Sequence, residues 1–170
     1  MKIISKTECE EWLQTNFGNG FTRTMPESDY PKSVAYQLPV DTGRKTALAR
    51  AISNLIDVRQ PGLFWITDWE IFPSSSNMIL FDGYRKSLGE DRPVHEAPGH
   101  VFDHPDLPQF ECLLDLALYF YWDASVFDGM RSVLIKLSHD EYVSIYTKDA
   151  ARLKLIEESL RRLKLEQFKS

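Results

Sequence analysis

The sequence has little cysteine, and the two that it contains, Cys9 and Cys112, form no CxxC pair. This spacing excludes a zinc ribbon, and it provides no disulfide framework of the kind that supports small secreted proteins. Both residues fall in stretches with helical periodicity, where a thiol usually behaves as a small apolar side chain. We therefore expect a protein that works in a reducing compartment.

Long apolar stretches are also missing. No run approaches the roughly 18 residues that a transmembrane helix requires. The N-terminal sequence MKIISKTECEEW lacks the apolar centre of about 7–15 residues that a signal peptide needs. These absences predict a soluble, cytoplasmic protein that does not bind membranes.

Complete motifs for nucleotide, calcium or acyl-transfer chemistry do not occur. The sequence contains no GxGxxG, no GxSxG elbow and no DxDxDG loop, and TGRKTALA at 42–49 lacks the first glycine of a phosphate loop. No cofactor is expected on this basis. The missing motifs favour a protein without catalytic activity over an enzyme.

Positive charge is in the minority, with 20 Lys and Arg against 25 Asp and Glu, which gives a net charge of −5. General nucleic-acid binding depends on Lys and Arg that neutralise phosphates, so the balance argues against a nucleic-acid partner. It suits a basic protein partner, although a charge of this size also serves solubility.

What is present is typical of a globular chain: 43% hydrophobic and 12% aromatic residues in 170, enough for one domain over residues 1–170. Hydrophobic periodicity and capping residues predict helices over 7–17, 42–60, 74–87, 108–117 and 148–168. Alternating segments predict strands over 2–4, 33–39, 62–72, 118–127, 133–137 and 141–147. Residues 90–108 hold four of the nine prolines, so we expect neither a long helix nor a central strand there.

The order of these elements predicts the fold class. Consecutive strands after residue 118 favour an α+β fold, with a mainly antiparallel sheet that ends in a three-stranded meander and helices packed on one face. Within the strand at 62–72, Leu63, Trp65 and Thr67 are expected on the buried side. Phe64 and Ile66 share the other side with the acidic residues.

Acidic and aromatic side chains on the predicted strands are the leading candidates for function. If they meet solvent side by side, they form a surface on which carboxylates contact Lys or Arg of a partner protein and tyrosines supply contact area. The predicted contact residues are Asp68, Glu70, Tyr119, Tyr121 and Asp123. The same carboxylates in a cleft would instead suit acid–base catalysis.

The stretch HEAPGHVFDH at 95–104 supports an alternative, a metal-assisted hydrolase. His95, His100 and His104, or two of them with Asp103, could gather round a metal ion, with Glu96 as a further ligand or base. The spacing does not match HExxH, because Gly99 stands where the second histidine belongs. An exposed polar loop explains the same residues without a metal.

Two further sites can be stated from the residues. His139, in a predicted hairpin turn, could act as a general base with Asp140 or Glu141, although a tight turn selects the same residue types. Trp65, Trp69 and Trp122 could line a pocket for a small ligand.

In size and acidic charge the chain resembles small bacterial immunity or inhibitor proteins, which neutralise a toxic partner through an acidic face. The resemblance implies a non-catalytic protein that acts by binding another protein. The sequence leaves the oligomeric state and the partner open.

Overall fold

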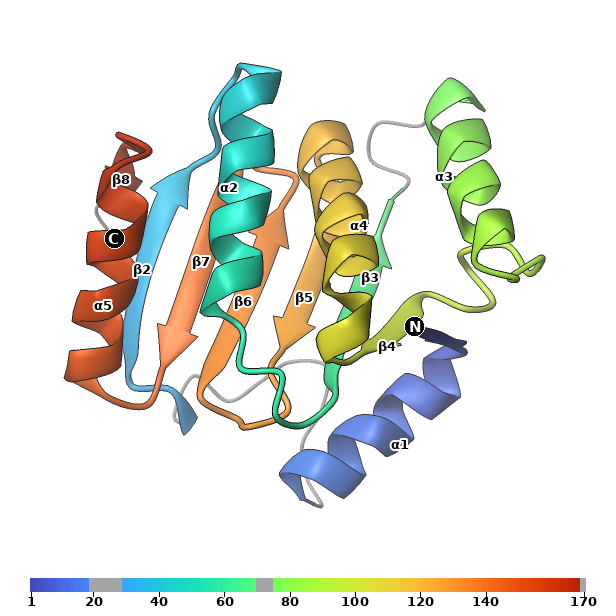
Figure 1. The fold of residues 1–170 in the computed structure, drawn as a ribbon, viewed down its shortest axis with the longest axis horizontal. Coiled ribbons are helices and arrows are strands. Elements are labelled where there is room, and N and C mark those ends of the chain that lie inside the picture. Colours follow the sequence, from blue (N-terminus) through green and yellow to red (C-terminus); the bar gives the residue numbers. More distant parts are fainter. Residues whose placement is uncertain (19–28, 70–74, 169–170) are drawn as a thin grey trace.

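The computed structural model describes residues 1–18, 29–69 and 75–168, and it shows an eight-stranded antiparallel sheet (Figure 1). The strands are β1 (Lys2–Ile4), β2 (Lys32–Gln37), β3 (Gly62–Asp68), β4 (Gly99–Phe102), β5 (Asp123–Phe127), β6 (Val133–Ser138), β7 (Tyr142–Thr147) and β8 (Gln167–Phe168). Their order across the sheet is β1-β4-β3-β5-β6-β7-β2-β8. The predicted α+β class, with β5, β6 and β7 as the meander, is confirmed.

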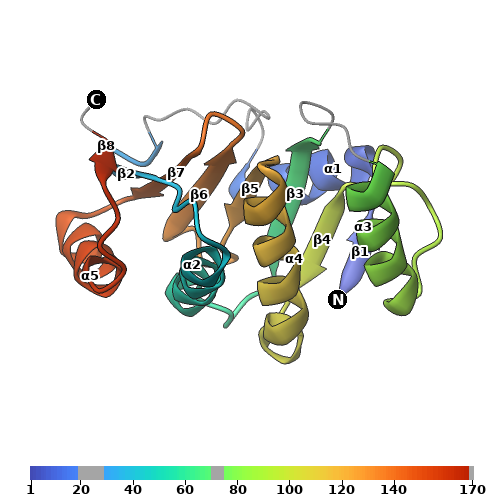
Figure 2. The same ribbon diagram turned by 90° about the horizontal axis from the view of Figure 1, so that it is seen from above.

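Four helices pack against one face of the sheet and one packs against the other. The helices are α1 (Lys6–Phe17), α2 (Thr42–Leu55), α3 (Ser75–Ser87), α4 (Leu107–Phe120) and α5 (Ala150–Arg161). Seen from above, α5, α2, α4 and α3 form a row on one side (Figure 2), and α1 lies on the opposite side. The prediction of helices on one face therefore holds for four of them, with α1 as the exception.

Each face of the sheet has its own apolar core. The first core joins the four-helix row to inward residues such as Phe64, Val126 and Ile135. The second core is smaller and joins α1 to Leu63, Trp65 and other residues that alternate with those of the first. The expectation that only one side of the strand at 62–72 is buried was wrong, because β3 lies centrally between two cores.

Local capping explains where several helices begin. Asp41 caps α2 by accepting from the Arg44 N–H at 2.8 Å, as the sequence indicates. The capping box of α1 is formed by Ser5 and Glu8. Thr7 and Glu10 have the same i,i+3 spacing two residues later and fit the predicted start at residue 7, so spacing alone does not separate the two registers.

Helix α4 continues further than predicted, to Phe120, and the expected strand at 118–127 is shortened to β5. The apolar face of α4 includes Leu118, and the helix ends at Tyr121 with φ 55°. A run of aromatic residues satisfies both an alternating and a helical pattern, and burial against the sheet decides for the helix. The last helix is shorter than predicted, because α5 ends at Arg161 and the chain returns as β8.

The region at 90–108 contains a strand that the prolines did not predict. Strand β4 lies between β1 and β3 as an internal member of the sheet. It fits because Pro98 precedes it and Pro105 follows it, so no strand N–H is lost to proline.

Candidate functional site

Two of the predicted contact residues meet at one end of the sheet. Asp68 is the last residue of β3 and Asp123 is the first of β5, and the antiparallel register places them directly opposite each other. The register shifts between Ile66 and Asp68, which brings the second aspartate level with the first. Two carboxylates that lie 55 residues apart in the sequence therefore become cross-strand neighbours.

A histidine from the next turn binds one of these carboxylates. His139, between β6 and β7, donates its backbone N–H to Asp123 Oδ1 at 2.7 Å, and its Nδ1 lies 3.0 Å from the same oxygen. Its Nε2 is 3.4 Å from Asp140 Oδ1. The hydrogen bond to Asp123 raises the pKa of His139, and the charges of Asp123, Asp140 and Asp68 add to this against the opposing effect of desolvation. We call Asp68, Asp123, His139 and Asp140 the acidic cluster.

The acidic cluster contains a carboxylate paired with an imidazole, which is one feature of a catalytic base. A carboxylate that orients an imidazole is the outer half of a nucleophilic triad. In His139, however, the nitrogen that would accept a proton faces Asp140. Within the described ranges, the hydrogen bonds of His139 go to Asp123, and none joins its imidazole to a hydroxyl or a thiol. The arrangement is suited to binding cations, since it offers three carboxylates against one imidazole.

The two predicted tyrosines belong to the helical layer and not to a strand, which corrects the expected surface. Tyr119 is on α4 and is 51% exposed, and Tyr121 ends that helix. Both rings face the ammonium group of Lys45 in α2, with Nζ 5.9 Å and 3.6 Å from the ring centroids. Tyr121 is two residues from Asp123 along the chain, but both tyrosine rings lie against Lys45 in the helical layer. Glu70 lies outside the described residues.

The three histidines proposed as metal ligands do not come together. His100 points inward from β4 between Phe64 and Phe81 and has no exposed surface. His95 and His104 are exposed. Among the described residues there is no group of three His, Cys, Asp or Glu side chains that could hold a metal ion. This metal site was predicted wrongly because strand alternation turns the middle histidine into the core.

His100 lies in an apolar setting together with a buried cation from α3. Burial first, and then the charge of Arg85, lower its pKa to about 3. Arg85 is itself 1% exposed and donates from Nη2 to the Ala97 carbonyl at 2.7 Å. Among the described residues, neither ring nitrogen of His100 has a hydrogen-bond partner. Sequence reasoning missed Arg85, because a cation on the inner side of an amphipathic helix has no distinctive local signal.

The proposed tryptophan pocket was also predicted wrongly. Trp65 packs in the second core and Trp122 in the first, so the sheet separates them. Both are almost fully buried, and Trp69 packs at the border of the first core. In a regular strand Trp65 and Trp69 would share a face, but Trp69 follows the register shift between Ile66 and Asp68 at the end of β3.

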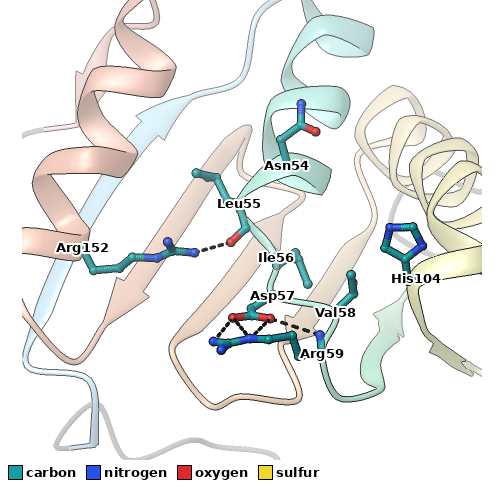
Figure 3. A pocket seen from close by; sticks show the side chains of 8 residues that line it. All are labelled: Asn54, Leu55, Ile56, Asp57, Val58, Arg59, His104 and Arg152. Atoms are coloured by element: carbon teal, nitrogen blue, oxygen red, sulfur yellow. Dashed lines mark hydrogen bonds and ion pairs between the residues drawn. The ribbon is translucent and has the colours of Figure 1, made fainter.

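A hollow of about 560 Å³ lies between the end of α2 and the beginning of α5 (Figure 3). Its charged side chains are largely satisfied by the protein. Arg59 forms a bidentate pair with Asp57, with Nε 3.0 Å from both carboxylate oxygens. Arg152 donates to the Leu55 carbonyl at 2.6 Å. The hydrogen bond of Arg152 joins α5 to the C-terminus of α2, so we interpret this hollow as a structural junction between the two helices.

A depression of about 590 Å³ lies on the second face of the sheet, beside the acidic cluster. Its floor is formed by alternate residues of β5, β6 and β7, among them Ser125, Lys136 and Ser144. Sequence reasoning missed it, although the alternation of the predicted meander marks these positions as facing the same way.

Comparison with models of protein families, with curated proteins and with solved structures finds no match to this chain. Over the described ranges, no helix combines the length and the hydropathy needed to cross a bilayer.

Proposed function

We propose that this chain is a non-catalytic binding protein that docks a basic partner protein on the acidic cluster. The observation that carries the proposal is the cross-strand pairing of Asp68 with Asp123. Like charges directly opposite each other in an antiparallel pair destabilise a sheet. The hydrogen bonds from His139 to Asp123 offset part of this repulsion, and a cationic partner would relieve more of it.

The surroundings of the acidic cluster support a protein partner over a small cation. The turn residues Asp140 and Glu141 are exposed beside it. Exposed carboxylates gathered at one place are typical of surfaces that speed association with an oppositely charged protein. An immunity or inhibitor role in the bacterial cytoplasm is the form of this function that the size and the charge fit best.

The test uses the purified product of the gene directly upstream of this one, with binding measured by calorimetry and by association kinetics. We expect a complex whose association rate falls with salt. Asp68→Asn combined with Asp140→Asn should weaken binding by about tenfold, mainly through the association rate. The free energy of unfolding should be unchanged or higher, by up to about 1 kcal/mol, because cross-strand repulsion is removed.

Glu158→Gln is the matched control, since it removes one exposed carboxylate from the outer side of α5. It should leave the affinity within twofold. If the upstream product does not bind, or if both variants weaken binding equally, docking on the acidic cluster is wrong.

A further inference from the structure

The second face of the sheet carries a polar depression next to the second core. Helix α1 covers the part of this face that includes Leu63 and Trp65 (Figure 2). Beyond it, over β5, β6 and β7, the outward residues are mostly serines and tyrosines, and they line the depression of about 590 Å³. This volume lies in the usual range for ligand sites, roughly 300–1,000 Å³.

The middle of the depression is a row of three residues that the sheet register places side by side. Lys136 of β6 is directly opposite Ser125 of β5 on one side and Ser144 of β7 on the other. Side chains opposite each other in neighbouring antiparallel strands have Cβ atoms about 5 Å apart. The ammonium group is therefore flanked by two hydroxyl groups on the same face.

The side-chain polar groups of Lys136, Ser125 and Ser144 form no ion pair or hydrogen bond with the other described residues. In the described ranges, no carboxylate lies within ion-pair distance of Lys136, whose Nζ is 5.4 Å from the Tyr146 ring centroid. The hydroxyl groups of Ser125 and Ser144 have no hydrogen-bond partner among the described residues. Asp123, at the end of the depression, is occupied by His139.

We propose that Lys136, Ser125 and Ser144 bind an oxyanion, the phosphate or carboxylate group of a small organic molecule. An ammonium group supplies charge and up to three donors, and each hydroxyl adds one donor, which matches the several acceptor positions of an oxyanion. The Tyr142 ring lines the depression, and the Phe168 ring packs against it with the two centroids 5.9 Å apart. Tyr142 gives an apolar wall for the organic part of the ligand.

The test is a backbone NMR titration of the full chain with inorganic phosphate and, separately, with acetate, at ionic strength held constant with NaCl. We expect saturable shifts centred on Ser125, Lys136 and Ser144 with at least one of the two anions. The anion that binds more tightly identifies the group that the natural ligand carries. Lys136→Met should weaken binding by about tenfold, because it removes a charge-assisted hydrogen bond and keeps the aliphatic stem.

Lys148→Met is the matched control, because Lys148 is an exposed lysine that also lies over a tyrosine ring, with Nζ 5.7 Å from the Tyr30 centroid, outside the depression. It should change the affinity less than twofold. Ser125→Ala tests the site separately if Lys136→Met does not fold, and it should weaken binding several-fold. The absence of saturable shifts with both anions, or an equal loss in both lysine variants, would overturn the proposal.

Discussion

At the scale of single residues, the most unusual feature is the pair formed by His100 and Arg85. Both are almost completely buried, on facing elements β4 and α3, and Phe81 contacts each of them. The nearest opposite charges that act on Arg85 are those of Glu90 and Asp82. Glu90 is bound to Arg92, with Nε–Oε1 at 2.9 Å. Buried polar groups without full hydrogen bonding cost stability, so this pair is a weak point of the first core.

The pair makes a prediction about pH. In the folded protein the pKa of His100 is about 3, and in the unfolded chain it is about 6.5. Between these values the unfolded chain binds more protons, so stability is lost as the pH falls from about 6.5 towards 3. From pH 7.5 to pH 5 the wild type should lose about 2 kcal/mol more unfolding free energy than His100→Leu.

Urea unfolding at the two pH values measures this difference. The other titrating groups, including His139 with its raised pKa, are common to both proteins and cancel in the comparison. Equal losses in the wild type and in His100→Leu would show that the imidazole is not held neutral in the core.

At the scale of elements, the close approach of α1 to β4 depends on a single glycine. A Cβ atom on Gly99 would lie 2.1 Å from Cys9 Sγ and 2.8 Å from Ile4 Cγ1. Cys9, which the sequence indicates only as a small apolar side chain, therefore forms a contact between α1 and the sheet. Its thiol is fully buried, and burial raises its pKa to about 12, which keeps it protonated and unreactive.

Gly99→Ala should lower the free energy of unfolding by about 1–3 kcal/mol, because the added methyl group forces α1 away from the second core. Gly83→Ala is the control within a helix, since nothing lies within 4 Å of the added carbon. It should raise stability by up to about 1 kcal/mol through helix propensity. Urea unfolding measures both changes. A Gly99→Ala protein as stable as the wild type would contradict this packing.

At the scale of the whole molecule, the two cores are joined because they share strands. Leu63 of β3 belongs to the second core and Phe64, its neighbour, to the first, and the same alternation occurs in β5 and β6. If one core comes apart, the shared strands are displaced, and the other core cannot stay packed. We therefore expect the chain to unfold in one cooperative step, as small domains usually do.

Fluorine NMR on protein labelled with fluorotryptophan checks this expectation without a substitution. Trp65 reports on the second core and Trp122 on the first. Their folded resonances should disappear at the same urea concentration. Two separate midpoints would show that α1 and its core open independently of the four-helix row.

The fold class was predictable because its signals are local. Polar capping residues such as Asp41 mark helix starts, and alternation marks the strands of the meander, whatever the rest of the chain does. The acidic cluster was predictable only in part. Asp68 and Asp123 lie within stretches that the pattern predicts as strands, although only the structure places them at strand ends. The partnership of His139 with Asp123 depends on the turn that brings them together.

The sequence by itself determined most of the secondary-structure types, the antiparallel meander and the acidic character of the chain, because propensity, periodicity and charge are properties of neighbouring residues. Only the tertiary structure decided that His100 is a core residue, that Tyr119 lies on a helix, and that Lys136 stands between two serines. Those outcomes depend on which strands become neighbours and on which face each helix covers, and pairing between distant segments is set by the burial of the whole sheet.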